Sequence, residues 1–233
     1  MARNYASSTN IILGFCAYGH HKGFFHKLVA YDNLITGLQY ISSALTGNPY
    51  TGNGRNLSYR KDLFFAHKGY YKSLSLHAGD DDLFINESAT DQNTWVEYSP
   101  ESITEMAKID RFSMWKEMKV SRAATQRYYK GWNLTFFRME SLSYFLFFIA
   151  VIASILMGIL GNWLISILAG LLYIIRFSTK ATILHKSAKL LQQKPVTGWL
   201  FLLELLLPLF NLYVRIYRIF RGKNDYTFRL GNK

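Results

Sequence analysis

The sequence predicts an α/β domain followed by membrane helices. Half of the 233 residues are hydrophobic, but they are unevenly distributed. Up to about Trp132, short apolar runs, an amphipathic stretch and Gly- or Asn-rich loops alternate, as in a soluble α/β protein. From Ser141 to Leu160 no charged residue occurs, and about 20 apolar residues suffice to span a bilayer. We therefore place a domain at residues 1–132 and a membrane region at 133–233.

The domain begins with a predicted buried strand, Ile11 to Phe15, because this run is short and continuously apolar. A helix is predicted next, over residues 28–45, where apolar side chains recur at helical spacing. It ends in Thr46-Gly47-Asn48-Pro49, a helix stop signal.

Two more strands are predicted in the domain. The strand over 55–61 runs into a helix start at Asp62, and the strand over 94–98 is closed by Ser99-Pro100. At the end of the first of these strands, Arg60 and Lys61 can neutralise a substrate phosphate, or they can be solvated charges.

Two loops carry residues of chemical interest. The loop 50–54 has closely spaced glycines that can cradle a phosphate, but it lacks the Lys-Ser/Thr ending of a P-loop. His20, His21 and His26 lie in a Gly- and Phe-rich loop with no cysteine or carboxylate among them. They are either metal ligands or ordinary loop histidines.

The acidic run Asp80-Asp81-Asp82 follows Gly79 and precedes the apolar residues 83–85. Like charges this close raise one another's pKa and require a cation, donors or water. A glycine permits a sharp bend, and the apolar residues would anchor it to a core. The run is therefore either an acidic cluster at the rim of the domain or a solvated turn that caps the next helix, since Asp is a favoured N-cap residue.

Residues 141–160 and 163–179 are two predicted spans joined by the turn Gly161-Asn162. So short a turn requires an antiparallel helical hairpin. The alternative, a hairpin buried in a soluble protein, is disfavoured because the first run has no charge. A third apolar helix at about 197–216 has basic residues on both sides and contains Glu204, Pro208 and Asn211. Because basic residues mark the cytoplasmic side, an in-plane or re-entrant helix is preferred to a third span.

The formal net charge of +12 indicates an anionic partner. Ten of the 27 basic residues flank the apolar segments, and they are Lys130, Arg138, Lys180, Lys186, Lys189, Lys194, Arg215, Arg218, Arg221 and Lys223. We attribute the charge to anionic lipid, with the N-terminal domain on the cytoplasmic face of a bacterial inner membrane, and expect no nucleic-acid partner. The single cysteine, Cys16, permits no intrachain disulfide.

Two motifs occur in order before the membrane helices. They are Gly54-Arg55-Asn56-Leu57-Ser58-Tyr59-Arg60-Lys61 and Gly79-Asp80-Asp81-Asp82-Leu83. In this order and spacing they resemble the back half of family 2 glycosyltransferases, whose membrane-attached relatives include cellulose and hyaluronan synthases. The Gly-Asp-Asp…Asn pattern, completed by Asn86, is particularly similar to the hyaluronan synthase type. The resemblance covers about Ile11 to Trp132 and is looser through the membrane region.

The resemblance implies a GT-A fold, which is a nucleotide-binding α/β sandwich. It also implies inverting transfer of a sugar from a nucleotide-sugar donor to a hydroxyl of a lipid or glycan acceptor. By this resemblance Asp81, with Asp80 as the alternative, is the general base that deprotonates the acceptor hydroxyl. The residues that would shape the donor or acceptor pocket are Asn56, Tyr59, Arg60 and Asp82.

The family also has a donor side that these residues lack. Its uridine-binding strand and metal-binding Asp-x-Asp precede residues similar to Ile11 to Phe15, so we expect this chain to be a C-terminal, acceptor-side portion. Asp80-Asp81-Asp82 has the Asp-x-Asp spacing but follows the strand 55–61, so no metal ligand is assigned here. The intact enzyme is expected to need a divalent cation, Mg or Mn, because a nucleotide diphosphate is strongly anionic.

The segment 109–129 is helical in pattern and rich in Arg and Lys, with Trp115 and Met118 on its apolar face. The family's Gln-x-x-Arg-Trp motif should fall on this helix. The best match is 118–122, where Met, Ser and Arg replace Gln, Arg and Trp, and this change argues against processive synthesis. Lys119 and Arg122 either face a pyrophosphate or belong to a structural helix on the membrane surface.

Two functions from different classes therefore remain. The first is a membrane-bound inverting glycosyltransferase whose donor-binding half lies outside these residues. The second is a non-catalytic, membrane-anchored remnant or scaffold of such an enzyme. A small transporter is disfavoured, because the clean spans contain no ionisable residue and Glu204 is the only candidate.

Overall fold

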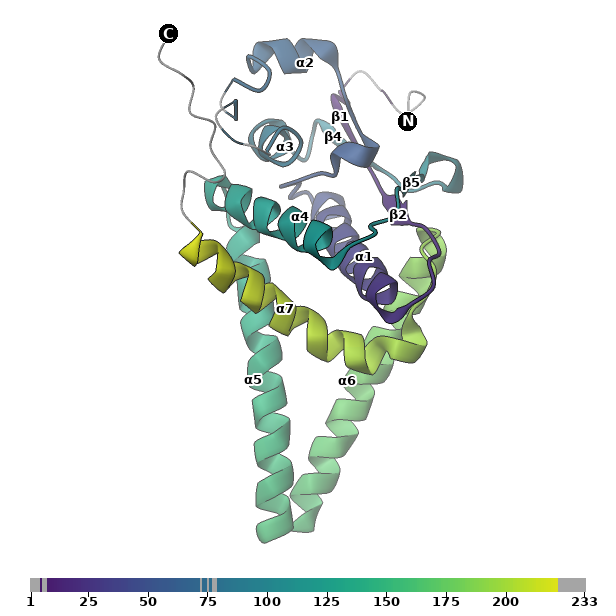
Figure 1. The fold of residues 1–233 in the computed structure, drawn as a ribbon, viewed down its shortest axis with the longest axis vertical. Coiled ribbons are helices and arrows are strands. Elements are labelled where there is room, and N and C mark those ends of the chain that lie inside the picture. Colours follow the sequence, from purple (N-terminus) through teal and green to yellow (C-terminus); the bar gives the residue numbers. More distant parts are fainter. Residues whose placement is uncertain (1–4, 6–7, 72, 75, 77–78, 222–233) are drawn as a thin grey trace.

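The computed structural model describes residues 5, 8–71, 73, 74, 76 and 79–221. The chain is mostly helical, with a small mixed sheet and three helices that are long and apolar enough to span a membrane. In Figure 1 the strands and shorter helices form one layered body, from which α5 and α6 project together, and α7 lies crosswise between that body and the hairpin.

A mixed sheet of three short strands forms the centre of the domain. β1 (Ile11–Gly14) pairs in parallel with β4 (Thr94–Glu97) and antiparallel with β3 (Leu57–Tyr59), and β2 (Cys16–Tyr18) pairs in parallel with β5 (Thr104–Met106). The residues at the start of β1 are fully buried, as expected of a strand covered on both faces. The three strands predicted from the sequence are confirmed, and each is shorter than predicted.

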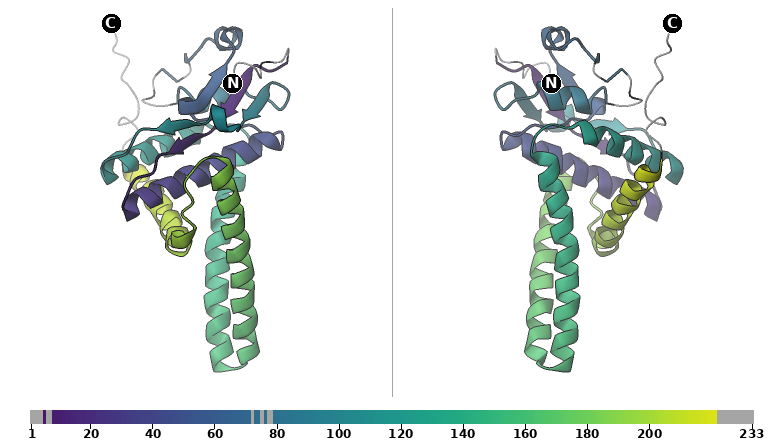
Figure 2. Two further views of the ribbon diagram at one scale, coloured as in Figure 1. Left: turned by 90° about the vertical axis from the view of Figure 1, so that its right-hand side faces the viewer. Right: turned by 90° about the vertical axis from the view of Figure 1, so that its left-hand side faces the viewer.

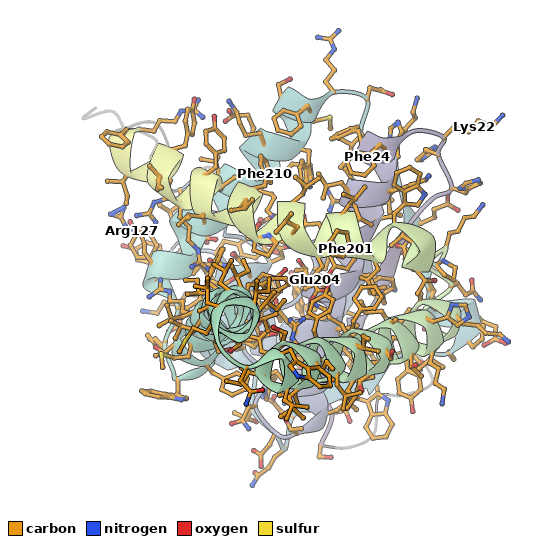
Figure 3. The ribbon with its side chains drawn as sticks, turned by 90° about the horizontal axis from the view of Figure 1, so that it is seen from below. Lys22, Phe24, Arg127, Phe201, Glu204 and Phe210 are labelled. Carbon is orange, nitrogen blue, oxygen red and sulfur yellow. The ribbon has the colours of Figure 1, made fainter. Side chains whose placement is uncertain are left out.

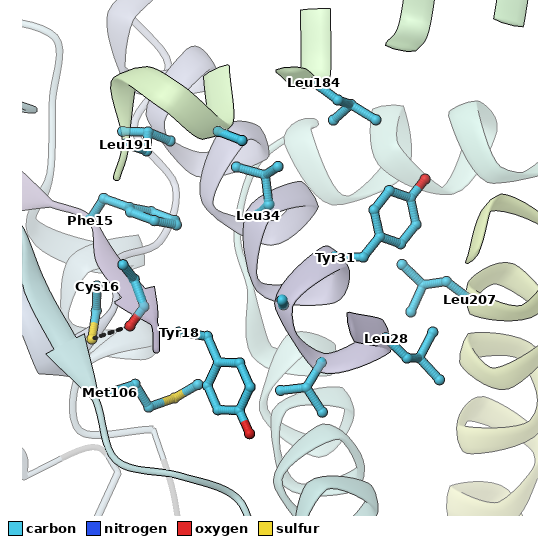
Figure 4. Packing of buried hydrophobic residues seen from close by; sticks show 14 of the residues in the cluster. Phe15, Cys16, Tyr18, Leu28, Tyr31, Leu34, Met106, Leu184, Leu191 and Leu207 are labelled. Atoms are coloured by element: carbon cyan, nitrogen blue, oxygen red, sulfur yellow. Dashed lines mark hydrogen bonds between the residues drawn. The ribbon is translucent and has the colours of Figure 1, made fainter. Parts of the chain in front are cut away.

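Helices cover both faces of the strands. α1 (Phe24–Leu45) packs on β2 and β4, and it ends at Thr46, followed by Gly47 at a φ of +82°. Figure 4 shows Leu28 and Tyr31 of α1 turned towards Leu207, with Phe15 and Tyr18 on the other side of the helix. The predicted helix over 28–45 is confirmed, and it begins earlier than predicted.

The opposite face carries two short helices, α2 (Lys61–Ala66) and α3 (Asp82–Ser88). Phe84 and Ile85 of α3 pack on Ile11 and Leu13 in a second core cluster. The apolar residues after the acidic run therefore do anchor it to a core, as predicted.

α4 (Phe112–Thr125) lies between the strands and α7 (Leu200–Phe220). Trp115 is buried and stacks on Phe210 of α7, with ring centroids 4.3 Å apart. Short 3-10 turns occupy Gly54–Asn56, Pro100–Ser102, Gln126–Tyr128 and Thr197–Trp199.

α5 (Asn133–Leu160) and α6 (Trp163–Leu190) form the predicted antiparallel hairpin. The side chain of Asn162 caps α6 by accepting the Leu164 N–H at 3.1 Å. The hairpin projects away from the rest of the chain (Figure 2), and its apolar side chains are mostly exposed. These helices are therefore not the buried core of a soluble protein.

The chain returns to the domain after α6. Gln193, which is buried, accepts the Tyr18 N–H and donates to the Tyr18 carbonyl, both at 2.8 Å, so it pairs with β2 as a neighbouring strand would. α7 then crosses below the domain (Figures 1 and 3). Its own residues Leu203, Leu207 and Val214 are buried. α7 lies crosswise to the hairpin (Figure 1), and with the turn before it, it is one of the three segments long and apolar enough to span a membrane. Lys223 lies outside the described residues.

Candidate functional site

The acidic run forms a sharp turn at the start of α3. Gly79 has a φ of +117°, a conformation that favours glycine, and a Cβ there would lie 2.7 Å from Leu83. Asp81 is the N-cap residue: its Oδ1 accepts the Asp82 N–H at 2.8 Å. The turn that caps a helix, one of the two alternatives left by the sequence, is therefore present. The acidic cluster at a rim is present as well, because Asp80, Asp81 and Asp82 all line a cavity.

The glycine loop 50–54 lies against this turn. The N–H of Gly54 donates to Asp81 Oδ2 at 2.7 Å, and a Cβ on Gly54 would lie 3.0 Å from the same oxygen. Glycine thus lets the two loops approach closely. The Gly54 N–H binds the protein's own carboxylate, so it is not part of a phosphate cradle.

Asp82 is the buried member of the run. Its Oδ2 accepts hydrogen bonds from the Thr125 hydroxyl and, at 2.8 Å, from the Tyr129 hydroxyl, while its Oδ1 accepts the Leu83 N–H at 2.8 Å. Burial raises the pKa of the Asp82 carboxyl, the two hydroxyls oppose this, and the charge of Asp81 adds to it. Asp82 therefore fixes the acidic run to the end of α4.

The cavity has a volume of about 770 Å³ and lies between the domain and the membrane helices. Its walls come from α1, the loop 50–55, the acidic run 79–82, the segment that holds Met106 and Ile109, α4 with the turn after it, the first part of α5 and the middle of α7. A volume of several hundred Å³ suits a ligand of the size of a sugar nucleotide or a glycan unit.

One wall holds a buried ion pair that the sequence did not reveal. Asp32 of α1 accepts the Trp115 indole N–H at 3.1 Å and pairs with the Lys119 ammonium. Burial lowers the pKa of Lys119, and the charge of Asp32 opposes that shift. Asp32 lies four residues after Leu28 on the buried side of α1, and a lone carboxylate on an apolar helix face was the available clue.

Arg122 lies one turn beyond Lys119 and lines the same cavity. Burial lowers the pKa of its guanidinium, but the nearby Tyr129 hydroxyl and the carboxylates of Asp81 and Asp82 outweigh burial and leave that pKa above its ordinary value. The cavity thus brings together a carboxylate, Asp81, and two cations on one helix. Lys119 and Arg122 were both singled out from the sequence, and both face the cavity.

Three predicted pocket residues, Asn56, Tyr59 and Arg60, are not among the residues that line the cavity. Asn56 is buried and donates to the carbonyls of Phe15 and Ser102, both at 2.7 Å. Its amide joins the segments next to β1 and β5 and does not face the cavity, where a substrate-binding residue would be expected.

Tyr59 and Arg60 are also engaged elsewhere. The Tyr59 hydroxyl lies 2.6 Å from the Tyr70 hydroxyl, and its ring packs on Phe84. The Arg60 Nε donates to the Thr9 carbonyl at 2.9 Å, and its guanidinium stacks over the Tyr5 ring. The motif from Asn56 to Arg60 is therefore a structural element beside the site, whereas Gly54 and Arg55 at its start line the cavity.

The described residues offer no cluster of three or more His, Cys, Asp or Glu side chains suited to a metal ion. Both oxygens of Asp81 and of Asp82 accept hydrogen bonds from N–H or hydroxyl donors. Donors of this kind suit a carboxylate that is stabilised by hydrogen bonds and do not suit a cation site. Asp81 and Asp82 therefore do not fit the divalent cation expected for the intact enzyme.

The three histidines are engaged with other side chains. His26 Nδ1 lies 2.8 Å from the Tyr18 hydroxyl, and the His21 ring packs on both Tyr18 and His26. His20 Nε2 lies 2.8 Å from Lys194 Nζ. This arrangement favours ordinary loop histidines over metal ligands.

The site and fold together define a class: a membrane-associated protein whose cavity, lined by charged and apolar side chains, lies where the domain with the strands meets an apolar hairpin. No family model matches the chain, and no curated protein matches it.

Proposed function

We propose that the protein is the acceptor-side, membrane-bound part of an inverting glycosyltransferase of the GT-A type. It would transfer a sugar from a nucleotide-sugar donor to a hydroxyl acceptor. The observation that carries the proposal is the cavity in which Asp81 faces the same space as Lys119 and Arg122. A base and a pair of cations are what this transfer requires.

In the proposed reaction the acceptor oxygen attacks the anomeric carbon of the donor sugar. Its proton passes to the carboxylate of Asp81, or of Asp80 in the alternative assignment. The new carbon–oxygen bond forms as the bond from the anomeric carbon to the nucleotide diphosphate breaks, and the diphosphate leaves with the electron pair. Lys119 and Arg122 stabilise the charge that develops on the diphosphate.

The proposed setting is a multi-pass protein at the cytoplasmic face of a bacterial inner membrane. The hairpin α5–α6 would cross the bilayer, and α7 would lie along its surface. The supporting observation is that the basic residues lie at the domain end of the hairpin, whereas 141–175 contains no charge. The donor-binding half is proposed to lie outside these residues.

A second function, a non-catalytic scaffold, is favoured by one specific observation. Both carboxylate oxygens of Asp81 already accept backbone N–H groups, from Gly54 and Asp82. A carboxylate held in this way serves as a helix cap, and a cap needs no chemistry.

The test is a transfer assay on membranes from cells that express the protein from its own locus. The membranes receive a panel of radiolabelled nucleotide sugars, and transfer to lipid or glycan is measured. Asp81→Asn should abolish transfer, while Asp62→Asn, which also changes an exposed carboxylate in a helix first turn, should not. No transfer from any donor by the unchanged protein, or full transfer by Asp81→Asn, would favour the scaffold.

A further inference from the structure

The cavity has one wall made by the membrane helices. α5 contributes Arg138 and Ser141, and α7 contributes Leu207, Asn211, Val214 and Arg215. Arg138 is also the first residue of the apolar stretch 138–160 that is long enough to span a membrane. This wall therefore lies where the head groups of a surrounding bilayer would begin.

Two cations on this wall, Arg138 and Arg215, face the cavity and are not paired with a carboxylate among the described residues. Among the basic residues of α7, Arg218 donates to the Ala123 carbonyl at 2.8 Å and Arg221 pairs with Glu117 at 2.5 Å, so both hold α7 on α4. Arg215 and Arg138 form no ion pair within the described part of the chain, and both line the cavity, where the positive charge of Arg138 acts on Arg215. An anion between these arginines would relieve their repulsion.

The rest of the wall is amphipathic. Leu207 and Val214 are buried apolar side chains. Between them in the chain, Asn211 has a buried amide oxygen with no hydrogen-bond partner. A buried polar atom without a partner is unfavourable, and a hydroxyl or N–H of a ligand would satisfy it.

We propose that this wall binds the phosphate of a lipid-linked acceptor. Arg138 and Arg215 would hold the phosphate, the apolar chain would leave towards the membrane beside Leu207 and Val214, and the hydroxyl to be glycosylated would extend into the cavity. This inference rests on the proposed function and names the class of its acceptor. The nucleotide diphosphate of the donor carries the same chemistry, and the experiment separates the two sources.

The experiment measures binding of radiolabelled farnesyl phosphate to the protein in nanodiscs of zwitterionic phosphatidylcholine. We expect saturable binding of farnesyl phosphate that UDP does not displace. We expect farnesol, which lacks the phosphate, to bind more weakly. Arg138→Gln and Arg215→Gln should each weaken binding by about tenfold, the loss expected for one charge-assisted contact. Lys186→Gln and Lys189→Gln are matched controls, because each removes one exposed charge of α6 that does not line the cavity. Each should change binding by less than about twofold.

Three outcomes would overturn the proposal. Displacement of farnesyl phosphate by UDP would assign the arginines to the donor. Equal losses of binding in the lysine variants would show only a general attraction to a basic surface. Binding of farnesol as tight as that of farnesyl phosphate would show that the site does not recognise the phosphate. The UDP and farnesol measurements need no variant, so a variant that fails to fold leaves the test intact. Failure here would leave the transfer assay with Asp81→Asn unaffected, so the two proposals fail separately.

Discussion

The strongest prediction concerns Glu204, which connects α7 to the hairpin. Its side chain is 2% exposed, and its Oε1 pairs with Arg176 Nη1 at 2.8 Å and with Lys180 Nζ at 3.0 Å. Figure 3 labels Glu204 between α7 and the hairpin. Replacing Glu204 by Ala leaves two cations without their carboxylate, and removing one partner of a buried pair costs about 3–5 kcal/mol.

The expected change in melting temperature follows from that cost. A chain of this size loses about 2–4 °C per kcal/mol, so Glu204→Ala should melt roughly 6–20 °C below the unchanged protein. Glu204→Gln retains an acceptor at the Oε1 position, so its melting temperature should fall by an amount near the lower end of this range. The measurement is thermal unfolding in detergent, followed by intrinsic tryptophan fluorescence.

The control is Glu140→Gln, because Glu140 is exposed on α5 and its contact with Gln39 is long, at 3.4 Å. It should shift the melting temperature by less than about 2 °C. If Glu204→Ala had the same melting temperature as the unchanged protein, the conclusion that this ion pair holds α7 in place would be refuted.

Three further predictions concern the site. Gly79→Ala should lower the free energy of unfolding by about 1–3 kcal/mol, because an alanine at this positive φ strains the backbone. Gly170→Ala, where a Cβ meets nothing within 4 Å, should not lower it. Equal effects of the two substitutions in chemical denaturation would contradict backbone strain at Gly79. Asp32→Asn should cost about 3 kcal/mol by leaving Lys119 unpaired, and Asp32→Asn with Lys119→Met should recover most of that loss; no recovery would contradict the pairing. Since burial raises the pKa of Asp82 in the folded state, its protonated form is favoured, so its contribution to stability is present below the unfolded pKa and is lost as pH rises through the folded pKa. The stability of Asp82→Asn relative to the unchanged protein should therefore increase from pH 4 to pH 7, and a difference independent of pH would contradict this.

The local elements were predictable because their signals are local. The continuous run at Ile11, the stop signal after Leu45 and the uncharged stretch from Ser141 each follow from residues that are neighbours in the chain. The structure places strands, helix and hairpin at those positions. The position of the third apolar helix, α7, is again a local property, because it follows from a continuous apolar run with basic flanks.

The site was only partly predictable, because its parts come from distant segments. Asp81, Asp82, Lys119 and Arg122 were singled out through the motifs that carry the family resemblance. The sequence gives no reason to connect Asp32 with Lys119, which is 87 residues away. Asn56 and Tyr59 were placed in the pocket by resemblance alone. Their side chains are taken up by pairing between strands and by an aromatic cluster, which depend on tertiary packing.

The proposed transfer reaction depends most on the chemistry of Asp81. The most direct measurement compares donor binding with sugar transfer in Asp81→Asn, using the membranes and donor panel of the transfer assay. We predict that nucleotide-sugar binding is retained while transfer falls by about 10²–10⁴-fold, the contribution of a general base. Transfer at the unchanged rate, with donor bound as before, would contradict the role of Asp81 as the base.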